Sequence, residues 1–298
     1  MKILHFLNWS TYTMKVRHLL RLYEQGNRNF AGADLCGADL RGVILIGVNL
    51  KGANLTGADL TRAFLIKSDL SGAQMSWANL NFAKMSEATL VETDLTKANI
   101  SGAFLVKSKL AGAKFSGADL SGTNLRRANL RGANFCGAQL ERSNLRDANL
   151  SGANFKWANL SEARLIGAKL DGSSLTFANL SRAWLKGLDI AGFDLEGVNF
   201  HRARLSGANL EGANLSSANL TEAQLDRVNL KRANLRGANL TEASLEEANL
   251  TNAILTKADL TGVHLRGAKL YDVDVQNVPT KTTMLPDLID YSLYSTVV

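Results

Sequence analysis

The chain has 298 residues, an apolar fraction of 46% and a net charge of +7. No run of 18 apolar residues is present, which excludes an apolar membrane-spanning helix. The short apolar run at the start is not followed by a small-residue cleavage site, so we expect no signal peptide and a cytoplasmic protein. The net positive charge is consistent with an ordinary mixed-charge surface and only weakly favours acidic partners such as nucleic acid.

Residues 1–29 make up the first predicted segment. Thr13 can serve as the N-cap residue of a helix that runs to about Gln25, and Gly26 can serve as the C-terminal stop of that helix. The apolar residues of this stretch have helical spacing and share one face: Val16, Leu19, Leu20 and Tyr23. We expect the helix to cap the N-terminal end of the repeat that follows.

The second segment, residues 30–278, is a repeat with a period of five. Every fifth position from Phe30 to Val275 is a large apolar residue, 50 in succession. Two positions earlier, 35 of the 49 residues from 33 to 273 are Ala. Residues spaced i−2 and i point to the same side of an extended chain, so we expect both sets to fill one interior. Phe115, Phe135 and Phe155 should then stack in one interior column.

Glycine marks the corners of this repeat. Of the 25 glycines, 24 stand two residues after a large apolar position. Glycine at a fixed phase indicates φ > 0, as in a type II turn. The two prolines, at 279 and 286, lie outside the repeat. Their position fits coils whose backbone N–H groups all pair with the next turn.

The units Ala-Asp-Leu-Cys-Gly, Ala-Asn-Leu-Thr-Gly and Ala-Asn-Leu-Ser-Ser resemble the A(D/N)LXX motif of the pentapeptide-repeat family. The resemblance covers residues 30–275, and residues 19–35 resemble the entry into the coil in cyanobacterial members. It implies an all-β solenoid, a right-handed quadrilateral β-helix with four pentapeptides per coil and about twelve coils.

The third segment, residues 279–298, is a short tail. Four of its apolar residues have helical spacing, which predicts a cap for the C-terminal end: Leu285, Leu288, Ile289 and Leu293. A homodimer contact through the tail is the alternative, because further apolar residues lie at its end: Tyr291, Tyr294, Val297 and Val298.

One outward column of the repeat departs from the Asn or Asp pattern of the other columns. The residue before each large apolar position is Asn or Asp in 30 of 49 units, but ten of the twelve residues in the column 44, 64 and onward to 264 are exceptions. We expect this column and its corners to bind a protein partner, because aromatic residues and Arg are enriched in interfaces. The predicted contact residues are Ile44, Ile46, Phe64, Ile66, Trp77, Phe82, Phe104, Val106, Trp157, Arg164, Phe177, Trp184 and Arg204.

The same column is also consistent with two roles inside the protein itself. Its side chains can stabilise the coil by stacking on one another, as Arg164, Trp184 and Arg204 would in a cation–π sandwich. Alternatively, the first thirty or the last twenty residues fold back over it.

No catalytic constellation, metal-ligand set or cofactor motif is visible, since the four His are dispersed and the glycines never precede a helix. The favoured function is therefore a non-enzymatic interaction scaffold with a protein partner. The family resemblance also implies an alternative, because some members mimic DNA and inhibit gyrase. Mimicry needs an acidic surface, which a charge of +7 disfavours. Direct binding of nucleic acid through Lys and Arg, and a passive structural rod without a ligand, are the remaining alternatives.

Overall fold

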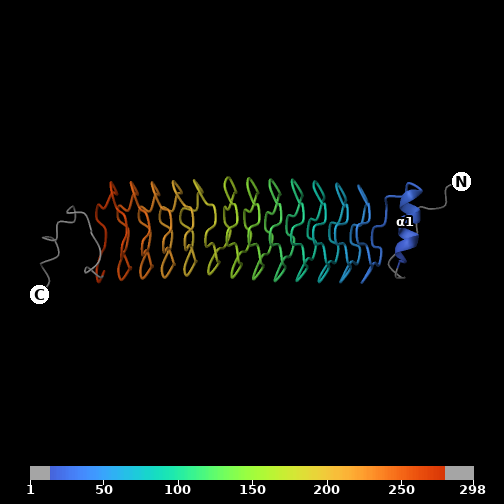
Figure 1. The fold of residues 1–298 in the computed structure, drawn as a ribbon, viewed down its shortest axis with the longest axis horizontal. Helices are drawn as coiled ribbons and strands as arrows, with labels where there is room; N and C mark the ends of the chain where they lie inside the picture. The colour runs from blue at the N-terminus through green and yellow to red at the C-terminus, as the bar shows by residue number, and fades with distance from the viewer. Residues whose placement is uncertain (1–13, 279–298) are drawn as a thin grey trace, which may run out of the picture. The chain divides into compact units, whose positions relative to one another are not determined.

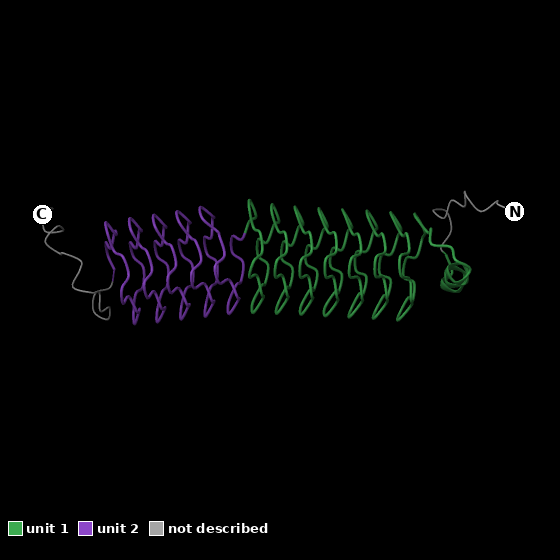
Figure 2. Cartoon of the chain, turned by 90° about the horizontal axis from the view of Figure 1, so that it is seen from above, with its two compact units in different colours: residues 1–174 green, residues 175–298 purple. Residues whose placement is uncertain are grey.

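The structure is a computed structural model that describes residues 14–278; residues 1–13 and 279–298 lie outside the described part. The chain divides into two units, Met1–Ser174 and Leu175–Val298 (Figure 2). Within each unit the backbone winds in stacked coils, and helix α1 precedes the first coil of unit 1 (Figure 1). The C-terminal tail, with its predicted cap and dimer contact, falls outside the described residues.

The coils have the register that the repeat predicts. Parallel bridges join residues 20 positions apart, such as Asp34 with Asn54 in unit 1 and Asn199 with Asn219 in unit 2. Four five-residue units therefore complete one coil, and each coil has four sides. We name the sides after their first outward residues: side 34, side 39, side 44 and side 49.

The interior contains the two predicted sets of side chains. Leu55, Ala53 and Leu145 are fully buried in unit 1, as is Leu215 in unit 2. Phe115, Phe135 and Phe155 stack as expected, with ring centroids 4.8 Å apart and planes within 2° of parallel. Burial of each large apolar side chain contributes about 1.5–3 kcal/mol, so this interior is what holds the coils together.

The second residue of every corner has positive φ. These 50 positions run from 32 to 277 in steps of five, and 24 of them are glycine while 26 are not. A representative corner is closed by the Ala33 N–H, which donates to the Phe30 carbonyl at 3.1 Å. The fixed position of glycine within the five-residue unit thus predicted the corner conformation correctly. At the other 26 positions the conformation costs about 1 kcal/mol, which the coil must offset.

Helix α1 spans Val16–Glu24. It begins later than the sequence suggested: Lys15 is its N-cap residue and makes no side-chain cap bond. Thr13, the predicted cap, lies outside the described residues. Gly26 ends the helical stretch with φ of 94°, as predicted. Within residues 14–278, no helix is long and apolar enough to cross a membrane.

Candidate protein-binding surface

The Asn and Asp side chains of the repeat have a structural role. Oδ1 of Asp34 accepts the backbone N–H of Cys36 at 3.2 Å and also Nδ2 of Asn54, in the next coil, at 3.0 Å. One side chain therefore closes its own corner and bonds the same position in the next coil. A column without Asn or Asp gives up both bonds.

Side 44 of unit 1 is such a column over its first four coils, before Asn124 and Asn144 restore the pattern. Ile44, Phe64, Lys84 and Phe104 follow one another in it, and each is joined to the next by a parallel bridge. Ile44 is 58% exposed and Phe104 is 45% exposed. Apolar side chains thus stand in solvent where other columns carry hydrogen-bonded amides.

The corners of side 44 extend this surface. Phe82 lies on the corner shared with side 39, and Ile46, Ile66 and Val106 lie on the corner shared with side 49. Ile46 and Phe82 are 43% and 49% exposed. We call seven residues of unit 1 the apolar patch: Ile44, Ile46, Phe64, Ile66, Phe82, Phe104 and Val106. An outward apolar group of this kind is a common feature of interaction sites.

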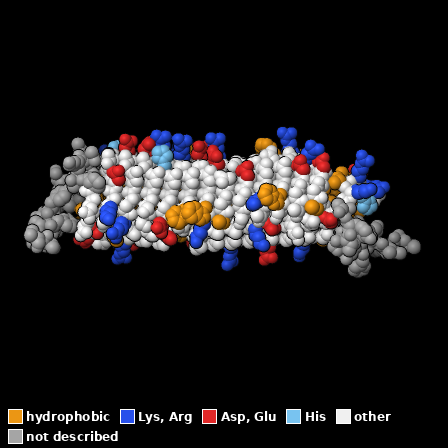
Figure 3. Space-filling view, turned by 90° about the horizontal axis from the view of Figure 1, so that it is seen from below, with side chains coloured by type: hydrophobic (Ala, Val, Ile, Leu, Met, Phe, Trp, Pro, Cys, Tyr) orange, Lys and Arg blue, Asp and Glu red, His pale blue; other side chains and the backbone are white. Residues whose placement is uncertain are grey.

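Six of the thirteen predicted contact residues do not belong to this patch, and three of these six were assigned to the wrong corner. Trp77, Trp157 and Phe177 were placed on the corners of side 44, and that placement is wrong. Trp77 and Trp157 stand in the column 37, 57 and onward, on the corner between sides 34 and 39, so the whole of side 39 separates them from side 44 in unit 1, and Phe177 belongs to unit 2. Among the four aromatic residues that were predicted at these corners, only Phe82, two positions before Lys84 of side 44, is on an adjoining corner. Figure 3 shows that hydrophobic side chains reach the face drawn there in small groups among polar residues.

In unit 2, the column that begins at Trp184 is mostly polar. Trp184 is partly buried, and the Arg204 guanidinium lies 3.8 Å from the centre of its ring, which is a contact that the self-stacking hypothesis predicts. Further along, the column carries Gln224, Ser244 and His264. Arg164 is an exposed residue of side 44 in unit 1, three coils beyond Phe104. The apolar patch therefore consists of residues of unit 1 alone, and the column of residues 184 to 264 in unit 2 has no counterpart of it.

Two contacts fix aromatic rings of the patch. Lys84 Nζ lies 4.5 Å from the centre of the Phe64 ring. The Phe82 ring covers Gly102 in the next coil, because a Cβ atom at Gly102 would be only 2.4 Å from Phe82 Cε1. This second contact was not predicted, although the spacing of 20 residues between an aromatic residue and a glycine could have revealed it.

Basic side chains surround the patch. On side 44 and its two corners, residues 41–47, 61–67, 81–87, 101–107 and 121–127 include a single acidic residue, Glu87. The basic residues there are Arg41, Arg62, Lys67, Lys84, Lys107, Arg126 and Arg127. Among the described residues, Arg62, Lys107 and Arg126 form no ion pair. Arg41, Lys67 and Arg127 are paired with carboxylates, and the remaining basic residues leave the surroundings of the patch net positive.

Helix α1 contacts the edge of this surface. The Tyr23 hydroxyl donates to the Ile46 carbonyl at 3.0 Å. Ile44, in the same coil, nevertheless stays 58% exposed. The described part of the first thirty residues therefore does not cover the patch.

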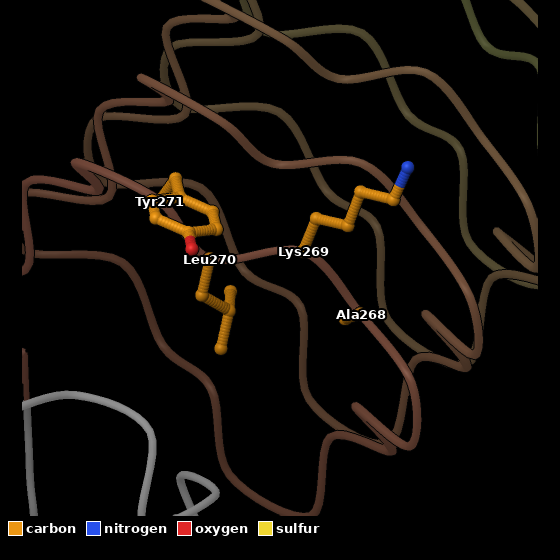
Figure 4. A pocket seen from close by; sticks show the side chains of 4 residues that line it. All are labelled: Ala268, Lys269, Leu270 and Tyr271. Atoms are coloured by element: carbon orange, nitrogen blue, oxygen red, sulfur yellow. The ribbon is translucent and has the colours of Figure 1, made fainter.

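A hollow and the metal-ligand types of side chain in the described residues were the other candidates for a chemical site. A hollow of about 310 Å³ at the last coil is lined by Ala268, Lys269, Leu270 and Tyr271. Lys269 and Tyr271 extend away from each other there (Figure 4), so they do not form an acid–base pair. Within residues 14–278, no three His, Cys, Asp or Glu side chains are arranged to hold a metal ion.

Four-sided coils of five-residue units around a Leu and Ala interior define a β-helical repeat protein. The family model for pentapeptide repeats matches eight copies, over residues 29–62, 73–112, 108–147, 148–187, 194–232 and 233–272. The chain belongs to the pentapeptide repeat family. Members with known structures form right-handed quadrilateral β-helices, and the family consists of non-enzymatic repeat proteins.

Several solved structures are similar to this chain. HetL, a pentapeptide repeat protein involved in heterocyst differentiation regulation in the cyanobacterium Nostoc sp. strain PCC 7120, is 34% identical over 88% of this chain and 94% of its own, with a TM-score of 0.39. Rfr23 from the cyanobacterium Cyanothece 51142 is 27% identical over 53% of this chain and 96% of its own, with a TM-score of 0.27. QnrB1, a plasmid-mediated fluoroquinolone resistance protein, is 23% identical over 69% of this chain and 89% of its own, with a TM-score of 0.33. The comparison with proteins of curated function gave no match.

Proposed function

We propose that this protein is a non-enzymatic interaction scaffold whose apolar patch binds a protein partner. The observation that carries the proposal is the exposure of Ile44 and Phe104 in the part of side 44, residues 44 to 104, that has no Asn or Asp. An exposed apolar side chain there gains neither the corner bond nor the bond to the next coil. Contact with a partner would remove this apolar surface from water and offset the loss.

Self-stacking accounts for Phe64 and Trp184 in part but not for the other exposed residues of the patch. The cation–π contacts of Phe64 and Trp184 contribute about 0.5–1 kcal/mol each at exposed sites. Ile44 is aliphatic and makes no such contact, yet it is more exposed than the aromatic residues Phe82 and Phe104 of the same patch. We therefore assign Trp184 and Arg204 to self-stacking and the patch to partner binding.

We propose that this scaffold has a regulatory role. HetL, 34% identical to this chain, is described as involved in the regulation of heterocyst differentiation. A scaffold without chemistry of its own acts on a pathway by binding one of its proteins. A DNA-mimic role has less support, because basic rather than acidic groups surround the patch.

We also propose that the repeat forms about twelve coils and that α1 closes its N-terminal end. The spacing of 20 residues within each unit supports this number of coils over residues 30–275. Leu19 of α1 is fully buried, and the Met14 N–H donates to the Asp34 carbonyl at 2.7 Å. An uncapped first coil would expose its interior and its unpaired backbone groups.

The test combines partner capture with thermal stability. The variant carrying Phe64→Asn and Phe104→Asn should lose the partner captured from native lysate, while its thermal midpoint does not fall. The control Trp77→Asn removes an exposed ring from another corner and should capture normally. A large fall in the midpoint with capture intact would show that the rings only stabilise the coil. If the captured partner is no longer retained by the protein at about 0.5 M salt, the partner would instead be a nucleic acid.

A further inference from the structure

We propose that the occupant of the apolar patch is an acidic amphipathic α-helix of the partner, lying along the coil axis of unit 1. This inference rests on the proposed function and specifies the chemistry of the partner. Three properties of the surface lead to it: its paired backbone, its axial spacing and its charge.

The backbone under the patch has no edge to which a strand could add. The Leu45 N–H donates to the Phe64 carbonyl, and the Leu65 N–H donates to the Lys84 carbonyl, both at 2.8 Å. The Phe64 N–H donates in turn to the Val43 carbonyl at 2.8 Å. Recognition by strand addition needs free backbone groups. A helix satisfies its own backbone and contacts the surface through side chains alone, so it suits this face.

The spacing of the patch is close to that of a helix. The stacked phenylalanines of unit 1 place successive coils 4.8 Å apart, and one turn of α-helix rises about 5.4 Å. Ile44 and Phe104 are three coils apart, or about 14 Å, so a helix of about three turns would span them. In three of the four coils, apolar residues in two neighbouring columns, 44 and 46, give the patch the width of an apolar helix stripe, and in the remaining coil, where Lys84 and Ser86 stand, Phe82 supplies the apolar side chain.

The charge around the patch indicates which sign of charge the partner should carry. Seven basic residues and one acidic residue stand on side 44 and its corners across these coils. Arg62, Lys107 and Arg126 lie outside the ion pairs of the described residues. Carboxylates flanking the apolar stripe of a helix would meet these groups, and a basic helix would be repelled.

The test uses the full-length protein and labelled peptides of about 16 residues, read by fluorescence anisotropy. The acidic peptide carries Leu at i, i+4, i+7 and i+11 with Glu on both flanks. A second peptide has Lys in place of Glu, and a third keeps the acidic composition but contains two prolines that prevent a helix. The acidic helix should bind at least about tenfold more tightly than either control peptide.

Matched variants locate the binding. Phe104→Asn should weaken binding of the acidic helix at least about tenfold, whereas Trp77→Asn should leave it unchanged. Lys107→Glu should weaken it more than Lys257→Glu, which makes the same charge change at a corner of unit 2 with similar backbone geometry. Equal effects of the two Lys variants would overturn the charge argument.

The outcomes separate this inference from the proposed function. If the basic or the proline-containing peptide binds as tightly and with the same dependence on Phe104, the acidic helix is the wrong occupant although the patch still binds. If the acidic helix binds without any dependence on Phe104, the inference is wrong. Failure of the proposed function is detected separately, by partner capture that survives loss of Phe64 and Phe104.

Discussion

Asn214 Nδ2 donates a hydrogen bond to Asp194 Oδ1 in the preceding coil, at 2.9 Å. Asn234 donates in the same direction to Asn214 at 3.1 Å, so the ladder runs from later coils to earlier ones. A carboxylate has no hydrogen to donate and can stand only at the accepting end. Asp34 and Asp189 occupy the same end of their ladders.

The direction of the ladder makes its two ends respond differently to substitution. Asn214→Asp removes the donor and places two carboxylates in neighbouring coils, which should destabilise the protein by about 1–2 kcal/mol at pH 7. The loss should shrink near pH 4, where one of the two carboxyls takes up a proton and can donate. The control Asp194→Asn keeps the acceptor and should be neutral. Thermal midpoints at the two pH values that do not differ for Asn214→Asp would contradict the ladder.

Two buried serines provide a matched pair. Ser68 Oγ donates to the Leu65 carbonyl at 2.6 Å, whereas Ser143 Oγ has no partner among the described residues. Ser68→Ala should lower stability by about 1 kcal/mol because it removes a made hydrogen bond. Ser143→Ala should raise stability by about as much, because it removes an unsatisfied hydroxyl. Thermal denaturation of both variants checks the signs, and a loss at both positions would refute the distinction.

The contact of Phe82 with Gly102 can be separated from the strain of the corner. Gly102 and Gly122 both have φ of 65°, but a Cβ atom at Gly122 would meet nothing within 4 Å. Gly122→Ala should therefore report the backbone cost alone, about 1 kcal/mol. Gly102→Ala should cost about 1 kcal/mol more, since the Phe82 ring must move. In a Phe82→Ala background this extra cost should disappear, and its persistence would show that the ring is not its cause.

Asp39 titrates below the normal range. Its hydrogen bond and ion pair with Arg41, at 2.6 Å between Oδ2 and Nη2, lower its pKa from 3.8 to about 2. Because the pKa is lowered in the folded state, the pair stabilises the fold above about pH 4 and the contribution is lost as the pH falls toward 2. Both side chains are more than half exposed, so solvent screening keeps the effect small. Carboxyl NMR should show the Asp39 pKa rising toward 3.8 in Arg41→Ala, and an unchanged value would exclude the pair as the cause.

The sequence predicts the interior and the corners because each depends on local chemistry. Alternation in an extended chain places Leu145 inside, and glycine at one phase indicates positive φ at corners such as that of Gly102. The period of five does not itself give the number of sides. That came from the family resemblance, and the 20-residue bridges within each unit agree with it.

The surface was harder to predict because it depends on how sequence positions map onto sides. Trp77 and Phe82 are five residues apart, yet they lie on different corners, since each unit of five advances the chain by one side. The start of α1 was also misplaced, because Lys15 makes no side-chain cap that a sequence motif could reveal. The sequence alone shows the Asn and Asp positions only as a pattern on the surface. Their hydrogen bonds in the structure show that these side chains stabilise the coil.

Site-specific photocrosslinking tests the central claim, that the apolar patch is a binding site. The photoreactive residue p-benzoylphenylalanine would replace Phe104, and for comparison Lys114, an exposed residue on side 34 across the coil. We predict one discrete crosslinked partner in native lysate from position 104 and none from position 114. Crosslinks from position 104 to the chain's own terminal segments, or equal products from both positions, would contradict the claim.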